Sequence, residues 1–161
     1  MSRLESAIRR LEAQRDCINW AATRIAGEPG YILELGLGNG RTWDHLRETF
    51  PDREIFVFER QIAAHPDCVP DEAHIFLGNI LDTLPHALTR LGRNVILAHD
   101  DIGTGDSDRN HKLAAKIAPL LAPLMRPGGL VLSDQPLPPG QWTELPPPAP
   151  VQPGRYHIYS T

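Results

Sequence analysis

With 161 residues, the chain is long enough to bury the core of one domain and short for two. Its 20 acidic residues outnumber its 16 basic ones, the net charge is −4, and no run of lysines or arginines stands out, which argues against nucleic acid or an anionic membrane as a partner. The sequence has no signal-peptide pattern and no apolar run of membrane-spanning length, and Cys17 and Cys68 lie far apart, so we expect a cytoplasmic protein without disulfides.

Helical and strand-like segments alternate along the chain. Apolar residues at helical spacing predict an amphipathic helix over residues 2–25, inside an N-terminal segment 1–27. The expected strands and the helices between them are, in order, 31–35, 41–50, 54–59, 74–77, 81–91, 94–98, a helix from about 109, and 130–133. This alternation predicts a three-layer α/β fold with a doubly wound, mostly parallel sheet over residues 31–134. Right-handed crossovers would then place the carboxyl ends of the strands at one edge, where ligands bind.

Prolines dominate the end of the chain. Eight of them lie within residues 136–153, so we expect this segment to form an extended loop rather than a helix or a central strand. Residues 155–160 are expected to form a last strand at the edge of the sheet. All 161 residues are therefore assigned to a single domain.

The most informative stretch is residues 32–40, Ile-Leu-Glu-Leu-Gly-Leu-Gly-Asn-Gly. An apolar strand breaks into three alternating glycines, and a helix follows. Such an arrangement lets a nucleotide lie against the main chain at a helix N-terminus. The dinucleotide fingerprint requires a small residue where this chain has Arg41, so the spacing argues against a nicotinamide cofactor.

Three alternating glycines after an acidic strand end resemble motif I of the class I S-adenosylmethionine (SAM) methyltransferases. Motif I is matched by Glu34, Gly36, Gly38, Asn39 and Gly40. The resemblance extends over about residues 31–134 and implies a Rossmann-like fold that binds SAM. In its short length and in the motif Gly-Leu-Gly-Asn-Gly-Arg-Thr, the chain is similar to a small bacterial group of predicted SAM methyltransferases. This resemblance implies no particular methyl acceptor.

The resemblance also implies roles for residues further along the chain. Glu59, at the end of the second strand, corresponds to the acidic residue that binds both ribose hydroxyls, and Arg60 after it could stack on adenine. Asn79 and Ile80 match the motif that receives adenine, although Asn79 could also simply cap the following helix. Asp100 is expected to orient the amino group of SAM.

The segment after the fourth strand carries the catalytic candidates, His99, Asp100 and Asp101. Histidine suits a general base because its ordinary pKa is near ~6.5, but a histidine at a strand end is as often part of the core. A second hypothesis pairs Asp100 with Asp134 and Gln135 after the fifth strand as ligands for Mg²⁺, as in the catechol O-methyltransferase-like branch. That branch has asparagine where this chain has Gln135, so no metal is our first expectation.

The family's fold has seven strands, and only one further strand fits comfortably after Asp134. We therefore expect a C-terminally shortened domain, completed by the proline-rich loop as a lid or by a second subunit in a homo-oligomer. The leading interpretation is a SAM-dependent methyltransferase acting on oxygen or nitrogen of a small molecule. The alternatives are a SAM-binding subunit without catalysis and an NAD(P)-dependent oxidoreductase, against which the lack of a Tyr-x-x-x-Lys pair also counts.

Overall fold

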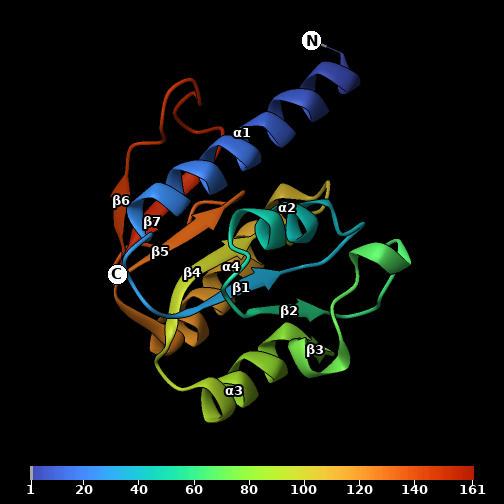
Figure 1. Ribbon diagram of the computed structural model, residues 1–161. Helices are drawn as coiled ribbons and strands as arrows, with labels where there is room; N and C mark the ends of the chain where they lie inside the picture. Colours follow the sequence, from blue (N-terminus) through green and yellow to red (C-terminus); the bar gives the residue numbers. More distant parts are fainter. Residues whose placement is uncertain (1) are drawn as a thin grey trace.

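The computed structural model describes residues 2–161 and contains a seven-stranded sheet in the order β3-β2-β1-β4-β5-β7-β6 (Figure 1). Strands β1 to β5 are parallel, and β7 runs antiparallel to both β5 and β6. The strands are β1 (Tyr31–Leu35), β2 (Ile55–Glu59), β3 (Ile75–Leu77), β4 (Val95–Asp100), β5 (Met125–Ser133), β6 (Thr143–Leu145) and β7 (His157–Ser160). The predicted doubly wound, mostly parallel sheet is confirmed.

Four α-helices cover the two faces of this sheet. They are α1 (Arg3–Arg24), α2 (Arg41–Thr49), α3 (Ile80–Leu91) and α4 (Ser107–Leu121), and the single-turn helices η1 (Pro66–Cys68), η2 (Glu72–His74) and η3 (Ala122–Leu124) lie in the connections. Helices α1 and α2 contact one another, as do α3 and α4.

The core is divided by the sheet into two apolar clusters. Because strand side chains alternate between faces, Ile32 of β1 packs in the cluster that contains α1 and α2, while Leu33 packs in the cluster that contains α3 and α4. Both residues are fully buried. A helical layer thus lies on each side of the sheet, as the three-layer prediction requires.

The helix ends follow local capping rules. Ser2 caps α1 by accepting a hydrogen bond from the Glu5 amide at 3.1 Å, as its position before the apolar periodicity predicts. Pro119 lies inside α4 without ending it. The change to a single-turn helix comes at Ala122, immediately before Pro123. None of the helices within residues 2–161 combines the length and apolar character needed to cross a membrane.

The C-terminal region departs most from the prediction. Residues 140–145 are free of proline and provide β6, so two strands follow Asp134 where one was expected. Strand β7 lies between β5 and β6 and is not the edge. The short β6 forms the edge instead. At an edge, the prolines that flank β6 do not have to donate a backbone hydrogen bond to a further strand. The sheet therefore has all seven strands, and the expected C-terminal shortening, which was the reason to expect a second subunit, is not observed.

Candidate functional site

The glycine turn lies at the carboxyl end of β1, between β1 and α2. Gly36, Gly38 and Gly40 all have positive φ, at 91°, 53° and 83°. A Cβ on Gly40 would lie 2.5 Å from Cys68 Cβ, which is a clash, and one on Gly36 would lie 3.1 Å from the Asp101 carbonyl oxygen, which is a tight contact, so packing favours glycine at both positions. A Cβ on Gly38 would meet nothing within 4 Å. The middle of the turn is thus open backbone that a ligand can approach.

Glu59 ends β2 and turns its carboxylate onto the glycine turn. Its Oε2 accepts hydrogen bonds from the Leu37 and Gly38 amides at 2.9 and 3.0 Å. Its Oε1 accepts from the Arg60 and Gln61 amides at 2.7 and 3.2 Å. Partial burial opposes ionisation, but these four N–H groups hold the pKa of Glu59 below its ordinary value. An ionised carboxylate therefore stands beside the turn.

A cavity of about 770 Å³ opens beside Glu59 and extends to α4. Its lining includes the predicted cofactor residues Gly36, Glu59, Arg60, Asn79 and Ile80. Apolar and polar residues complete the wall: Phe58, Gly78, Leu81, Ile102, Thr104, Asp106, Asp108, Arg109, Asn110, Lys112, Leu113 and Lys116. The structure thus brings the predicted ribose and adenine motifs to one hollow.

Two of the predicted cofactor residues also hold the local backbone. Asn79 caps α3, because its Oδ1 accepts from the Leu81 amide at 3.1 Å. Asn79 also lines the cavity, so the capping role does not remove it from the predicted adenine site. Asn39 is exposed, and its Oδ1 accepts from the Arg41 amide at 3.2 Å. Both side chains therefore shape the helix N-termini that face the site.

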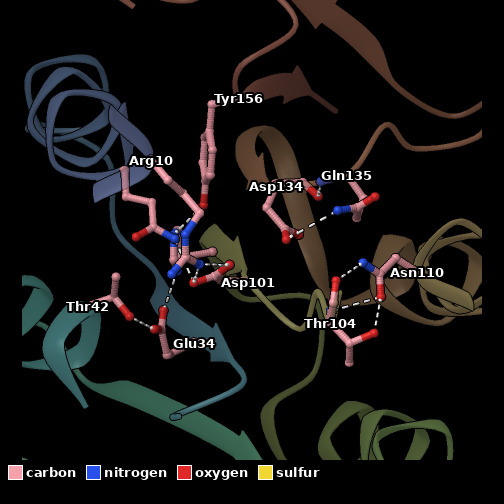
Figure 2. A network of polar contacts seen from close by, with 12 residues as sticks. Arg10, Glu34, Thr42, Asp101, Thr104, Asn110, Asp134, Gln135 and Tyr156 are labelled. Atoms are coloured by element: carbon pink, nitrogen blue, oxygen red, sulfur yellow. Dashed lines mark hydrogen bonds and ion pairs between the residues drawn. The ribbon is translucent and has the colours of Figure 1, made fainter. Parts of the chain in front are cut away.

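Two carboxyl groups meet at the ends of β4 and β5. Asp100 is 3% exposed, and burial together with the charge of Asp134 raises its pKa to about 7. Burial and the charge of Asp101 raise the pKa of Asp134 to about 6. Asp134 Oδ1 is buried and has no hydrogen-bond partner among residues 2–161, whereas its Oδ2 accepts from Gln135 Nε2 at 3.3 Å (Figure 2). Ionisation of both carboxyl groups is therefore unfavourable unless a proton or a positive charge binds beside them.

The same residues do not fit the magnesium hypothesis as they stand. Residues 2–161 contain no group of three histidine, cysteine, aspartate or glutamate side chains arranged to hold a metal ion. Asp100 and Asp134 provide two carboxylates, but Gln135 presents its amide N–H to Asp134 rather than an oxygen to a shared centre.

Asp101 is held by α1 rather than left free for catalysis. Gln14 Nε2 donates to its Oδ2 at 2.6 Å, and Arg10 forms an ion pair with its Oδ1 at 3.3 Å (Figure 2). The N-terminal helix therefore covers this corner of the sheet edge. The contact with Asp101 thus brings α1, which precedes the first strand in the sequence, to the carboxyl end of β4.

His99 and Glu34 differ most from their predicted roles. Strand β4 continues to Asp100 instead of ending at residue 98, so His99 lies within the sheet and is fully buried. Its Nδ1 is 2.6 Å from Glu34 Oε2, and its Nε2 is 2.6 Å from the hydroxyl of Tyr156. Glu34 is also fully buried and accepts a second hydrogen bond from Thr42. Neither side chain lines the cavity. The structure therefore favours the alternative of a core residue for His99, and it places Glu34 in contact with His99 and Thr42 rather than with the cavity.

The sequence and the structure were both compared with those of known proteins, and the comparisons identify the family. A family model described as S-adenosyl-L-methionine methyltransferase matches residues 1–161. The chain belongs to this methyltransferase family. A crystal structure of an S-adenosyl-L-methionine methyl transferase from Silicibacter pomeroyi DSS-3 is 43% identical, with a TM-score of 0.95 over 99% of this chain and 98% of the other. No match was found among curated proteins.

More distant structures share the fold of this methyltransferase. The sugar N-methyltransferase KedS8 from Streptoalloteichus sp. ATCC 53650 is 22% identical, with a TM-score of 0.51 over 77% of this chain and 47% of the other. DesVI from Streptomyces venezuelae is 17% identical, with a TM-score of 0.51 over 83% and 57%. The predicted family, fold class and SAM-dependent methyltransferase activity are confirmed. SAM replaces the nicotinamide alternative as the cofactor.

Proposed function

We propose that the methyltransferase transfers the methyl group of SAM to an oxygen or nitrogen atom of a small molecule bound beside Asp134. The observation that carries the proposal is the pairing of an open cofactor cradle with a carboxyl group of near-neutral pKa at the same sheet edge. Gly38 and Glu59 belong to the cradle, and Asp134 directly follows β5, which lies two strands away from β1.

The residues present fit the parts of SAM. The ionised carboxylate of Glu59 suits the two ribose hydroxyls, because two adjacent O–H groups can donate to its two oxygens. The cavity beside it gives Asn79 and Ile80 access to adenine, and Gly38 leaves the main chain open to the methionine portion. When bound, SAM supplies an electrophilic methyl group on a sulfonium centre.

The chain's remaining task is to align the acceptor and remove its proton. A general base works best when its pKa lies near the working pH, and the pKa of Asp134 is raised to about 6. Its Oδ1 is buried and has no hydrogen-bond partner among residues 2–161, so the proposal requires that the bound acceptor reach this atom and supply the missing O–H or N–H donor. We assign this role to Asp134 rather than to His99, which is sealed in the core, or Asp101, which is bound to α1.

The charge of the site supports a small neutral or cationic acceptor. Asp100, Asp101 and Asp134 converge on the sheet edge, and the whole chain is acidic, so a polyanionic nucleic acid would be repelled. Because the residues do not fit a metal centre, the proposed reaction uses no divalent cation.

The experiment measures S-adenosylhomocysteine release across a panel of small alcohols, phenols and amines, with wild type and Asp134→Asn. The proposal predicts turnover that rises with pH through about 6, and a loss on the order of 100-fold or more in kcat for Asp134→Asn. Affinity for S-adenosylhomocysteine should stay within about twofold, and the exposed Asp52→Asn variant is the matched control. Cofactor binding without turnover on any acceptor would favour a non-catalytic SAM-binding subunit, and an unchanged kcat in Asp134→Asn would remove the proposed base.

A further inference from the structure

Four polar side chains from four different parts of the chain form one continuous network, in which Thr42 is half-buried and the other three are buried. Thr42 donates to Glu34, Glu34 Oε2 lies 2.6 Å from His99 Nδ1, and His99 Nε2 lies 2.6 Å from the hydroxyl of Tyr156. Glu34 and His99 are fully buried, and Tyr156 is 1% exposed. We call Thr42, Glu34, His99 and Tyr156 the buried relay (Figure 2 labels three of them).

The buried relay holds both ends of the glycine turn. Glu34 lies two residues before Gly36 on β1, and Thr42 lies two residues after Gly40 in the first turn of α2. The other end of the network, Tyr156, directly precedes β7 and follows the proline-rich segment 136–153. The network therefore links the cofactor turn, through β4, to the C-terminal region.

The relay also reaches the proposed methyl-transfer edge along β4. His99 is followed directly by Asp100 and then by Asp101, which α1 holds through Gln14. Although burial disfavours the imidazolium, the carboxylate of Glu34 raises the pKa of His99 above its ordinary value. The two polar contacts of the His99 ring fix its orientation, and with it the strand segment that carries Asp100.

Stability alone gives no reason for such a network. Apolar side chains of similar volume often replace a buried ionic pair without loss of stability, whereas a fully satisfied polar network fixes one arrangement of its elements. The relay joins elements that must keep a precise distance for methyl transfer, the glycine turn on one side and the carboxyl ends of β4 and β5 on the other.

We propose that His99 and Tyr156 are positioning residues of the methyltransferase, which hold the cofactor turn in register with the acceptor edge by acting through Glu34 and Thr42. The inference rests on the proposed use of the glycine turn for SAM. Neither residue lines the cavity beside Glu59, so removal of the Tyr156 hydroxyl should loosen the turn and weaken cofactor binding from a distance.

The test compares Tyr156→Phe with Tyr159→Phe by calorimetry with S-adenosylhomocysteine and by thermal unfolding. Tyr159 is a matched control, because it is 4% exposed and its hydroxyl accepts from the Leu137 amide at 3.0 Å, outside the buried relay. Both variants should lower Tm, since each loses one buried hydrogen bond. Only Tyr156→Phe should raise the Kd, by roughly three- to tenfold.

Two further variants keep the result decisive. Thr42→Val removes the hydroxyl at the other end of the relay and should raise the Kd by a similar factor. His99→Leu should raise the Kd more, and adding Tyr156→Phe to it should have little further effect, because the link is already broken. Wild-type binding with equal Kd values in Tyr156→Phe, Thr42→Val and Tyr159→Phe would overturn the inference. Failure of the wild type to bind S-adenosylhomocysteine would instead overturn the proposed function.

Discussion

Replacing Asp100 by asparagine should make the stability of the free protein less sensitive to pH. The carboxyl group of Asp100 is almost completely buried, and burial and the Asp134 charge raise its pKa from 3.8 to about 7. Between these values the unfolded chain has released a proton that the folded chain retains, so the free energy of unfolding falls as the pH rises through this window. The loss is complete above the folded-state pKa. The amide of the Asp100→Asn variant does not titrate and would carry no such linkage.

The shift of about three pKa units corresponds to roughly 4 kcal/mol above pH 7, of which about 2 kcal/mol is already lost near pH 5. Urea unfolding at about pH 5 and about pH 8 should therefore show the wild type losing ~2–3 kcal/mol more than Asp100→Asn between the two conditions. The exposed Asp52→Asn variant should follow the wild type. Parallel losses in wild type and Asp100→Asn would refute the reasoning that Asp100 is held protonated by the fold.

Further predictions concern the glycine turn, the contact with α1 and the metal. Gly40→Ala should lower the free energy of unfolding by about 2 kcal/mol or more, because φ is 83° and the methyl would meet Cys68, whereas Gly38→Ala should cost about 1–2 kcal/mol and chiefly abolish S-adenosylhomocysteine binding in calorimetry. Similar binding losses in two equally stable variants would contradict this division. Gln14→Leu should cost about 1–3 kcal/mol in urea unfolding, because Asp101 loses a partner that is only 2% exposed. Arg10→Ala should cost under ~1 kcal/mol, because the Arg10 side chain is half exposed, and a larger loss for Arg10→Ala than for Gln14→Leu would contradict this ranking. Once an acceptor is found, EDTA should leave turnover unchanged, and restoration of lost activity by Mg²⁺ would contradict the metal-free mechanism.

Local signals in the sequence predict the cofactor side of the site. Gly36, Gly38 and Gly40 needed only the strand before them and the helix after them to be placed, and all three have the positive φ that favours glycine. Glu59 was assigned through the family resemblance, which places an acidic residue at the end of the second strand, and parallel pairing of β1 with β2 brings it to the turn. These positions depend on neighbours in the sequence or on an adjacent strand.

Long-range contacts account for the errors. The run His99-Asp100-Asp101 resembles a loop because it is polar, yet the first two residues extend β4, since Glu34 and Tyr156 satisfy the His99 ring. Tyr156 belongs to none of the motifs found in the sequence, and its partner His99 lies 57 residues away in the chain. The one sign of it in the sequence is an aromatic residue entering the last strand.

The C-terminal strands were misjudged for a similar reason. Proline content correctly excluded a central strand within residues 136–153, but an edge strand needs hydrogen bonds on one side only. Thr143–Leu145 pairs with β7 alone and so tolerates prolines on both flanks. Counting prolines did not reveal this short proline-free interval as β6.

Calorimetric titration of the wild type and Glu59→Gln with S-adenosylhomocysteine tests the central claim that the cradle formed by the glycine turn and Glu59 binds SAM. We expect one site per chain in the wild type and no heat from NAD. Glu59→Gln should raise the Kd by about 10- to 100-fold, because the charged acceptor for the ribose hydroxyls is lost. Absence of S-adenosylhomocysteine binding, or equal affinity in Glu59→Gln, would contradict the account.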